Sequence, residues 1–143
     1  MYTGQILVGL CISLANISIQ AVASVMLIRL MRKLSRRYVL KRKIMSLLFV
    51  MTITAAVLTI AHLIQVGVWS LSYDALGAVT VVADSYYLAF VNFTTLGYGD
   101  ILPAPDWRLL GPITAANGML LFGWSTALMF AVLSRATRLL QLS

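Results

Sequence analysis

Charged residues are scarce in this sequence, and their scarcity excludes most soluble folds. Of 143 residues, 11 are basic, four are acidic and 61% are hydrophobic. The mean hydropathy of +0.93 is far above that of an average soluble domain. So few ionic groups cannot cover a water-facing surface, and the chain is predicted to be a membrane protein.

Cysteine and histidine occur once each, which excludes a disulfide within the chain and a metal cluster of these ligands within one subunit. Cys11 lies in an apolar stretch, and we expect it to be a buried structural thiol. His62 lies in another. We expect a neutral imidazole hydrogen-bonded to a neighbouring helix, with proton sensing as the alternative. No nucleophile–base pair or paired carboxylates occur, so we expect neither an enzyme nor an organic cofactor.

Three apolar stretches, 6–28, 44–68 and 111–133, are long enough to cross a bilayer as helices. Small and polar residues recur on one helical face of the first stretch, and we expect this face to pack against protein rather than line a pore. They are Gly9, Ser13, Asn16, Gln20 and Ser24. A second such face is predicted for the second stretch, formed by Thr52, Ala55, Thr59, His62 and Gln65.

The charges are segregated along the chain. Eight of the 11 basic residues lie in 29–43, Arg135 and Arg138 lie near the end, and all four acids lie between the second and third stretches. This favours membrane topology over nucleic-acid binding. Basic segments stay in the cytoplasm, so we expect the N-terminus outside, a cytoplasmic 29–43 loop and a cytoplasmic tail at 136–143. The predicted location is the plasma membrane, of bacterial inner-membrane type.

The 29–43 loop is interpreted as a topological signal, with a surface for anionic lipid as the sharper alternative. The residues of this basic cluster are Arg32, Lys33, Arg36, Arg37, Lys41, Arg42 and Lys43. A voltage sensor is rejected because no acid precedes Asp74 and the charges are not separated by apolar pairs.

Between the second and third stretches the sequence changes character. Trp69 is expected to end the outer helix at the membrane interface, and 70–82 to form an extracellular turret. Asp84 is predicted to cap a helix that is too short to span.

Residues 94–100, Thr-Thr-Leu-Gly-Tyr-Gly-Asp, cannot continue that helix. Gly97 and Gly99 accept positive φ, and alternating such residues with ordinary ones can turn successive carbonyl oxygens to one side. A row of carbonyls can replace water around a cation.

The segment Thr95-Leu96-Gly97-Tyr98-Gly99 resembles the Thr-Val-Gly-Tyr-Gly filter of tetrameric potassium channels, with Leu in place of Val. From 44 to 135 the chain is similar to the two-helix pore module of that superfamily. The resemblance implies an outer helix at 44–69, a pore helix at 83–94, a filter at 95–100 and an inner helix at 111–135. The stretch at 1–28 has no counterpart in the minimal channels. The expected fold is an all-α membrane protein with three spans and a re-entrant pore helix and filter loop.

The resemblance also implies roles for single residues. Thr95 would bind ions through its hydroxyl and carbonyl, and the other sites would come from Leu96, Gly97, Tyr98 and Gly99. Thr94 belongs to the same mouth, and Pro103 and Trp107 stand where simple bacterial channels carry proline and tryptophan. Tyr87 is expected to brace Tyr98. Val91 replaces a glutamate that holds the filter aspartate in some members, so Asp100 is expected to lack that partner. Gly118, or its rival Gly123, is the expected gating hinge.

One chain supplies one filter loop, and a filter needs four, so the predicted assembly is a homotetramer. The function implied is a potassium-selective ion channel that holds K⁺ in its filter. Two alternatives are a weakly selective cation pore and a non-conducting membrane subunit that retains the fold.

Overall fold

The described part of the chain forms three long helices and two short ones. The computed structural model describes residues 2–37 and 43–139, and the side chains of 2–33 and 44–138. The long helices are α1 (Tyr2–Arg37), α2 (Lys43–Ala75) and α4 (Leu110–Leu139). Between α2 and α4 lie α3 (Val82–Phe93) and a 3₁₀ turn, η1 (Pro105–Trp107). No strand occurs in either described range, and the all-α prediction is confirmed.

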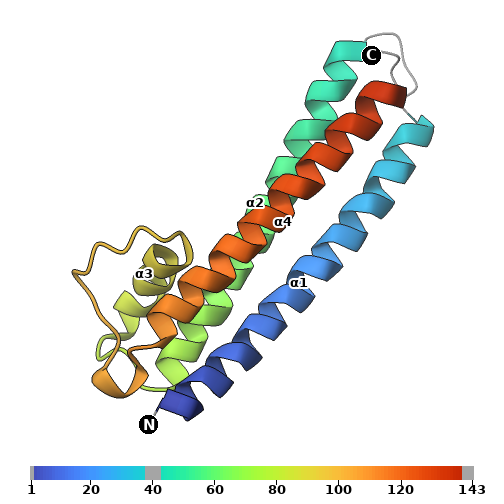
Figure 1. The fold of residues 1–143 in the computed structure, drawn as a ribbon. Helices are drawn as coiled ribbons and strands as arrows, with labels where there is room; N and C mark the ends of the chain where they lie inside the picture. Colours follow the sequence, from blue (N-terminus) through green and yellow to red (C-terminus); the bar gives the residue numbers. More distant parts are fainter. Residues whose placement is uncertain (1, 38–42, 140–143) are drawn as a thin grey trace.

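The long helices run side by side, and α3 with its following loop lies at the end of the bundle where the N-terminus also lies (Figure 1). Both α1 and α3 pack against α2 and α4. Three segments are long and apolar enough to cross a membrane: Tyr2–Lys33, Ile44–Ala75 and Pro105–Arg138. The predicted number of spans is therefore confirmed.

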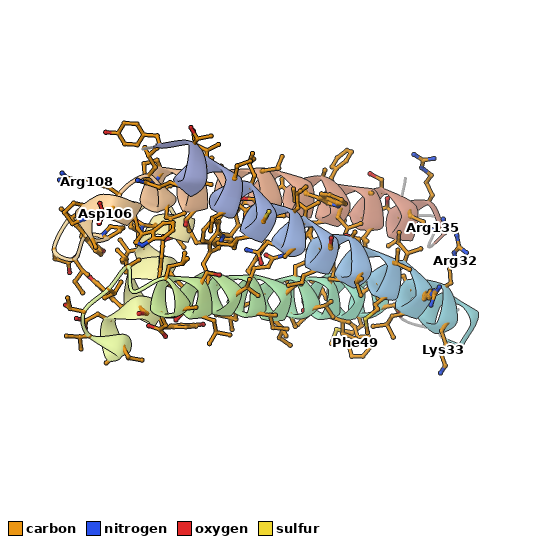
Figure 2. All side chains as sticks on the ribbon, turned by 90° about the horizontal axis from the view of Figure 1, so that it is seen from below. Arg32, Lys33, Phe49, Asp106, Arg108 and Arg135 are labelled. Carbon is orange, nitrogen blue, oxygen red and sulfur yellow. The ribbon has the colours of Figure 1, made fainter. Side chains whose placement is uncertain are left out.

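Charged side chains gather at the two ends of the bundle. Arg32, Lys33 and Arg135 lie at one end, and Asp106 and Arg108 lie at the other (Figure 2). The bundle between them presents apolar side chains outward, including Leu14, Ile64 and Phe130. This distribution suits a chain whose middle lies in hydrocarbon and whose ends lie in the headgroup regions.

The outer helix is longer than predicted. Trp69 was expected at its end, but α2 continues to Ala75. Trp69 is fully buried and donates its indole N–H to Asn117 Oδ1 at 3.1 Å. The stop signal is Gly77, whose φ of 61° lets the N–H groups of Gly77 and Ala78 bond back to carbonyls of the last turn. The predicted turret at 70–82 shortens to 76–81.

The start of α3 also differs from the prediction. Asp84 was expected at the N-cap, but Val81 occupies that position, in an extended conformation and without a side-chain cap bond. The Asp84 N–H bonds to the Val81 carbonyl at 2.9 Å, so Asp84 lies inside the first turn. Its carboxylate there still opposes the positive end of the helix dipole.

The small and polar face of α1 packs against the other long helices, as predicted. Asn16, Gln20 and Ser24 are buried, and an added Cβ on Gly9 would lie 2.8 Å from Ile113 Cδ1 of α4. Asn16 Nδ2 donates to Asn117 Oδ1 at 3.1 Å. Because lipid cannot satisfy polar groups, they mark where α1 joins the bundle.

The prediction that Cys11 is buried is wrong. Cys11 is exposed on α1, because the polar face occupies the packed side of that helix. On the predicted polar face of α2, Thr52 and Thr59 are exposed, whereas Gln65 is buried and Ala55 and His62 are half-buried.

The core lies where α3 meets α2 and α4. Fully buried Trp69, Tyr73, Phe93, Leu110 and Leu121 form its largest side chains. Gly118 of α4 approaches the last residue of α3 so closely that an added Cβ would lie 1.9 Å from the Phe93 carbonyl oxygen. A side chain cannot fit there unless one of the two helices moves.

We therefore expect Gly118→Ala to destabilise the fold by about 2–3 kcal/mol, a typical cost of overpacking against atoms that cannot yield. Gly123→Ala is the matched control, because the same added Cβ meets nothing within 4 Å. Its expected effect is neutral, or stabilising by up to ~1 kcal/mol from helix propensity. Thermal unfolding in detergent, followed by circular dichroism, compares the two. Equal melting temperatures would show that the contact between α4 and α3 is not as described.

Candidate functional site

The loop after α3 is fixed at its base by the helix that precedes it. Thr94 caps α3, and its hydroxyl donates to the Phe90 carbonyl at 2.7 Å. The N–H of Thr95 bonds to the Asn92 carbonyl at 2.9 Å, and the N–H of Leu96 bonds to the Val91 carbonyl at 3.0 Å. The loop therefore starts at the negative end of the α3 dipole, which favours a nearby cation.

Backbone conformation alternates along this loop. Thr95, Gly97 and Gly99 have positive φ, at 63°, 57° and 77°, whereas the intervening Leu96 and Tyr98 do not. Among the described non-glycine residues, Thr95 alone has positive φ, and a β-branched residue is strained there. Such strain persists only where the surrounding structure enforces it, and it concentrates at functional sites. A strict every-second-residue pattern lets successive carbonyl oxygens face one side.

The side chains of the loop are exposed in the single chain. All residues from Thr95 to Asp100 are exposed, including Leu96 at 55% and Tyr98 at 67%. One such row of oxygens covers one side of a cation and leaves the rest of its surface to other groups.

Comparison with known families matches residues 46–135 to the model of the family described as "Ion channel". The match covers more than half of the chain. The protein belongs to this ion channel family. The matched region begins near the start of α2 and ends within α4, so it contains the 94–100 loop, and α1 lies outside it. Comparison with curated proteins and with solved structures gives no match.

In this channel, Asp100 at the end of the loop has a partner that the sequence did not reveal. Tyr87 of α3 donates its hydroxyl to Asp100 Oδ2 at 2.7 Å, and the Ile101 N–H donates to Asp100 Oδ1 at 3.1 Å. Asp100 has no carboxylic acid partner at position 91, as expected, and Tyr87, one helical turn before Val91, takes that place instead. The Tyr87 hydroxyl thus supports Asp100, whereas the family resemblance implied that Tyr87 braces Tyr98.

The bond between Tyr87 and Asp100 changes the acidity of both groups. It lowers the pKa of Asp100, because the donated hydrogen bond stabilises the carboxylate. It raises the pKa of Tyr87 for the same reason. Both groups are exposed on the single chain, so the interaction matters more for the charge at the loop mouth than for stability.

The remaining predicted support residues act in different ways. Val91 is buried, and its carbonyl accepts the N–H groups of Leu96 and Gly97, so it contributes through its backbone. Trp107 packs against the core. A cavity of about 380 Å³ lies behind the loop. It is lined by Asn92, Thr95, Gly97, Leu102, Arg108 and Pro112, among others.

The first helix reaches the loop region directly. Gln5 of α1 accepts the Leu109 N–H through Oε1 at 2.9 Å. This N–H lies at the start of α4, where helices have no internal acceptors. The sequence did not single out Gln5, because it precedes the apolar stretch.

Other predicted residues lie away from the loop. His62 faces α4 and contacts Ser125, and Gly118 packs against Phe93. Arg32 and Lys33 of the basic cluster are exposed. Lys41 and Arg42 lie outside the described residues, as do the side chains of Arg36, Arg37 and Lys43.

We expect Tyr87→Phe to raise the pKa of Asp100 toward its ordinary value of 3.8. The hydrogen bond favours the ionised form, so it acts fully above that value and is lost as the pH falls through the lowered pKa of Asp100. Carboxyl ¹³C NMR can follow this titration, because the chain has only four acidic residues.

Tyr86→Phe is the control for that substitution, since the Tyr86 ring lies against Phe90 rather than on the loop. In the Tyr86→Phe variant, Asp100 should titrate as it does in the unmodified protein. Identical titrations in the Tyr87→Phe variant and the unmodified protein would rule out the contact.

Proposed function

We propose that this ion channel is a potassium-selective channel in which four copies of the 94–100 loop form the filter. The observation that carries the proposal is the alternation of positive φ at Thr95, Gly97 and Gly99. That conformation suits a row of carbonyl ligands, and the sequence of the row resembles a potassium filter. Potassium ions are the transported species held in the filter.

Conduction follows from ligand exchange. A hydrated cation approaches the mouth, where Asp100 is held ionised by Tyr87. It sheds water into rings of carbonyl oxygens from Leu96, Gly97 and Tyr98, with the hydroxyl of Thr95 as an additional ligand. Several adjacent sites let one ion displace the next by repulsion, so binding does not trap the ion.

The exposed loop supports a homotetramer. Irregular backbone at membrane depth requires protein or water to cover it, and the exposed Leu96 and Tyr98 need apolar neighbours. Three further copies around a common axis supply both, in a closed ring with four-fold symmetry. Four rows of oxygens then surround each ion.

We assign the orientation from the basic residues. The end with Arg32, Lys33 and Arg135 would face the cytoplasm under the positive-inside rule, so the filter mouth would face outside. The expected location is the plasma membrane, of bacterial inner-membrane type. The basic cluster at this end is suited to anionic lipid headgroups.

Purified protein in liposomes tests the proposal. We expect potassium efflux, with little sodium flux, from particles that contain four chains. Equal potassium and sodium flux would instead indicate a weakly selective cation pore. Intact tetramers without flux would indicate a non-conducting subunit.

Gly97→Ala tests the filter mechanism itself. Alanine at the φ of 57° costs about 1–2 kcal/mol, and four copies in one filter multiply the strain. We expect potassium flux to fall on the order of tenfold or more while the tetramer persists. Gly4→Ala, at an exposed glycine with no atom within 4 Å, should conduct normally. Unaltered flux through the Gly97→Ala variant would reject the carbonyl filter.

A further inference from the structure

Four polar side chains from three helices form a closed ring of hydrogen bonds in the middle of the bundle. His62 Nδ1 lies 2.8 Å from Gln65 Oε1, and Gln65 Nε2 lies 3.0 Å from Gln20 Oε1. Gln20 Nε2 lies 2.8 Å from Ser125 Oγ, which lies 3.0 Å from His62 Nε2. The ring therefore joins α1, α2 and α4, and it begins and ends at the only histidine of the chain.

The direction of the ring is set by a backbone carbonyl. Gln65 Nε2 also contacts the Asn16 carbonyl oxygen at 3.4 Å, and that oxygen can only accept. The Gln65 amide must therefore present its NH₂ group to α1 and its oxygen to His62. It follows that His62 Nδ1 carries a proton and donates to Gln65, while Nε2 accepts the Ser125 hydroxyl. The ring is complete when the imidazole is neutral.

A second proton on His62 has a defined place in this arrangement. It would bind at Nε2, which would then donate to Ser125 Oγ. The Ser125 hydroxyl would turn to the carbonyl of Leu121, four residues earlier, a bond that helical serines commonly make. No donor is left without an acceptor. The ring thus has two arrangements that differ by one positive charge.

The surroundings of His62 place this charge close to the filter. The imidazole centroid lies 4.7 Å from the Phe122 ring and 6.0 Å from the Phe93 ring, within the range of cation–π attraction. Phe93 is the last residue of α3, and Thr94 and Thr95 follow it directly. A charge held here lies beside the inner end of the predicted filter.

No charged side chain competes for His62 within the ring. Its partners on α2, α3 and α4 are Gln65, Phe93, Phe122 and Ser125, and α1 presents Gln20. On these helices the nearest charges along the chain are Arg29, nine residues from Gln20, Asp84, nine from Phe93, Arg135, ten from Ser125, and Asp74, twelve from His62. At a rise of 1.5 Å per residue these lie roughly 13–18 Å along the helix axes. Two other titratable side chains of these helices are directed elsewhere: Tyr73 bonds to Thr114, and Cys11 is exposed.

We propose that His62 is a proton-binding site that reduces potassium conduction when it is charged. The inference rests on the proposed potassium channel function. Four subunits place four such charges around one pore, where they repel potassium ions from the inner end of the filter. Histidine is the side chain that ordinarily changes charge between about pH 5 and pH 8, so conduction should be compared across this range.

Histidine NMR tests the site without relying on flux. The protein contains one histidine, so ¹⁵N-labelled imidazole gives one set of signals from the assembled protein in lipid. At about pH 8 we expect the tautomer with its proton on Nδ1, and we expect the charged form to appear as the pH falls to about pH 5. A histidine that stays neutral over this range, or the opposite tautomer at high pH, would overturn the proposal.

Potassium efflux from liposomes, measured across the same pH range, tests the consequence. We expect efflux to fall severalfold, with a midpoint that matches the imidazole titration. His62→Gln cannot take up a proton, and its efflux should not vary with pH. The loss of Asp100 charge does not explain the fall, because Tyr87 keeps the pKa of that carboxyl below its ordinary value.

The outcomes separate this proposal from the function on which it rests. Absence of efflux at every pH of the series counts against the potassium channel. Efflux that is independent of pH, or a pH response that survives in His62→Gln, counts against proton binding at His62 and leaves the channel function in place. If His62→Gln fails to assemble, a mismatch between the imidazole and efflux midpoints of the unmodified protein still rejects the proposal.

Discussion

Hydrocarbon offers no hydrogen bonds, so backbone polar groups inside the membrane must find partners within the protein. The 94–100 loop depends on this constraint more than any other segment, because its backbone has left the helix. The carbonyls of Val91 and Asn92 at the end of α3 bond the first N–H groups of the loop, and Tyr87 and the Ile101 N–H hold its last residue, Asp100. Both ends are thus fixed to protein, and the carbonyls between them are the groups still free to act as ligands for an ion.

The same constraint explains why the first helix belongs to the bundle, although the matched family region begins at residue 46. Without α1, the Gln65 amide N–H groups would lose both of their acceptors, Gln20 Oε1 and the Asn16 carbonyl, and Ser125 Oγ would lose the N–H that Gln20 donates. Leu109 N–H, at the start of α4, would lose Gln5. Interhelical hydrogen bonds of this kind contribute on average about 0.6 kcal/mol each, so their number matters more than any one of them. The first helix is therefore an integral part of the bundle that α2 and α4 form.

The sequence predicted what depends on local pattern and missed what depends on contacts between distant residues. Apolar stretches predicted the spans, and the spacing of Asn16, Gln20 and Ser24 predicted the buried face of α1, because helical periodicity is a property of neighbouring residues. The positive φ of Gly97 and Gly99 followed from residue type.

Trp69 was misplaced because an aromatic near the end of an apolar stretch resembles an interface residue, whereas its partner, Asn117, lies 48 residues away. The pairing of Tyr87 with Asp100 and the role of Ser125 have no local signal.

The end of α3 is where the moving and conducting parts of such a channel would meet. The Phe93 carbonyl lies against Gly118 of α4, and its ring packs on Phe122 at 5.4 Å. Bending α4 at Gly118 would disturb this contact and the residue that precedes the 94–100 loop. An added Cβ at Gly123 meets no atom within 4 Å, so a bend there would leave the contact between α3 and α4 intact. The close approach at Gly118 thus holds α4 against the end of α3, whereas Gly123 has the room that a hinge would need.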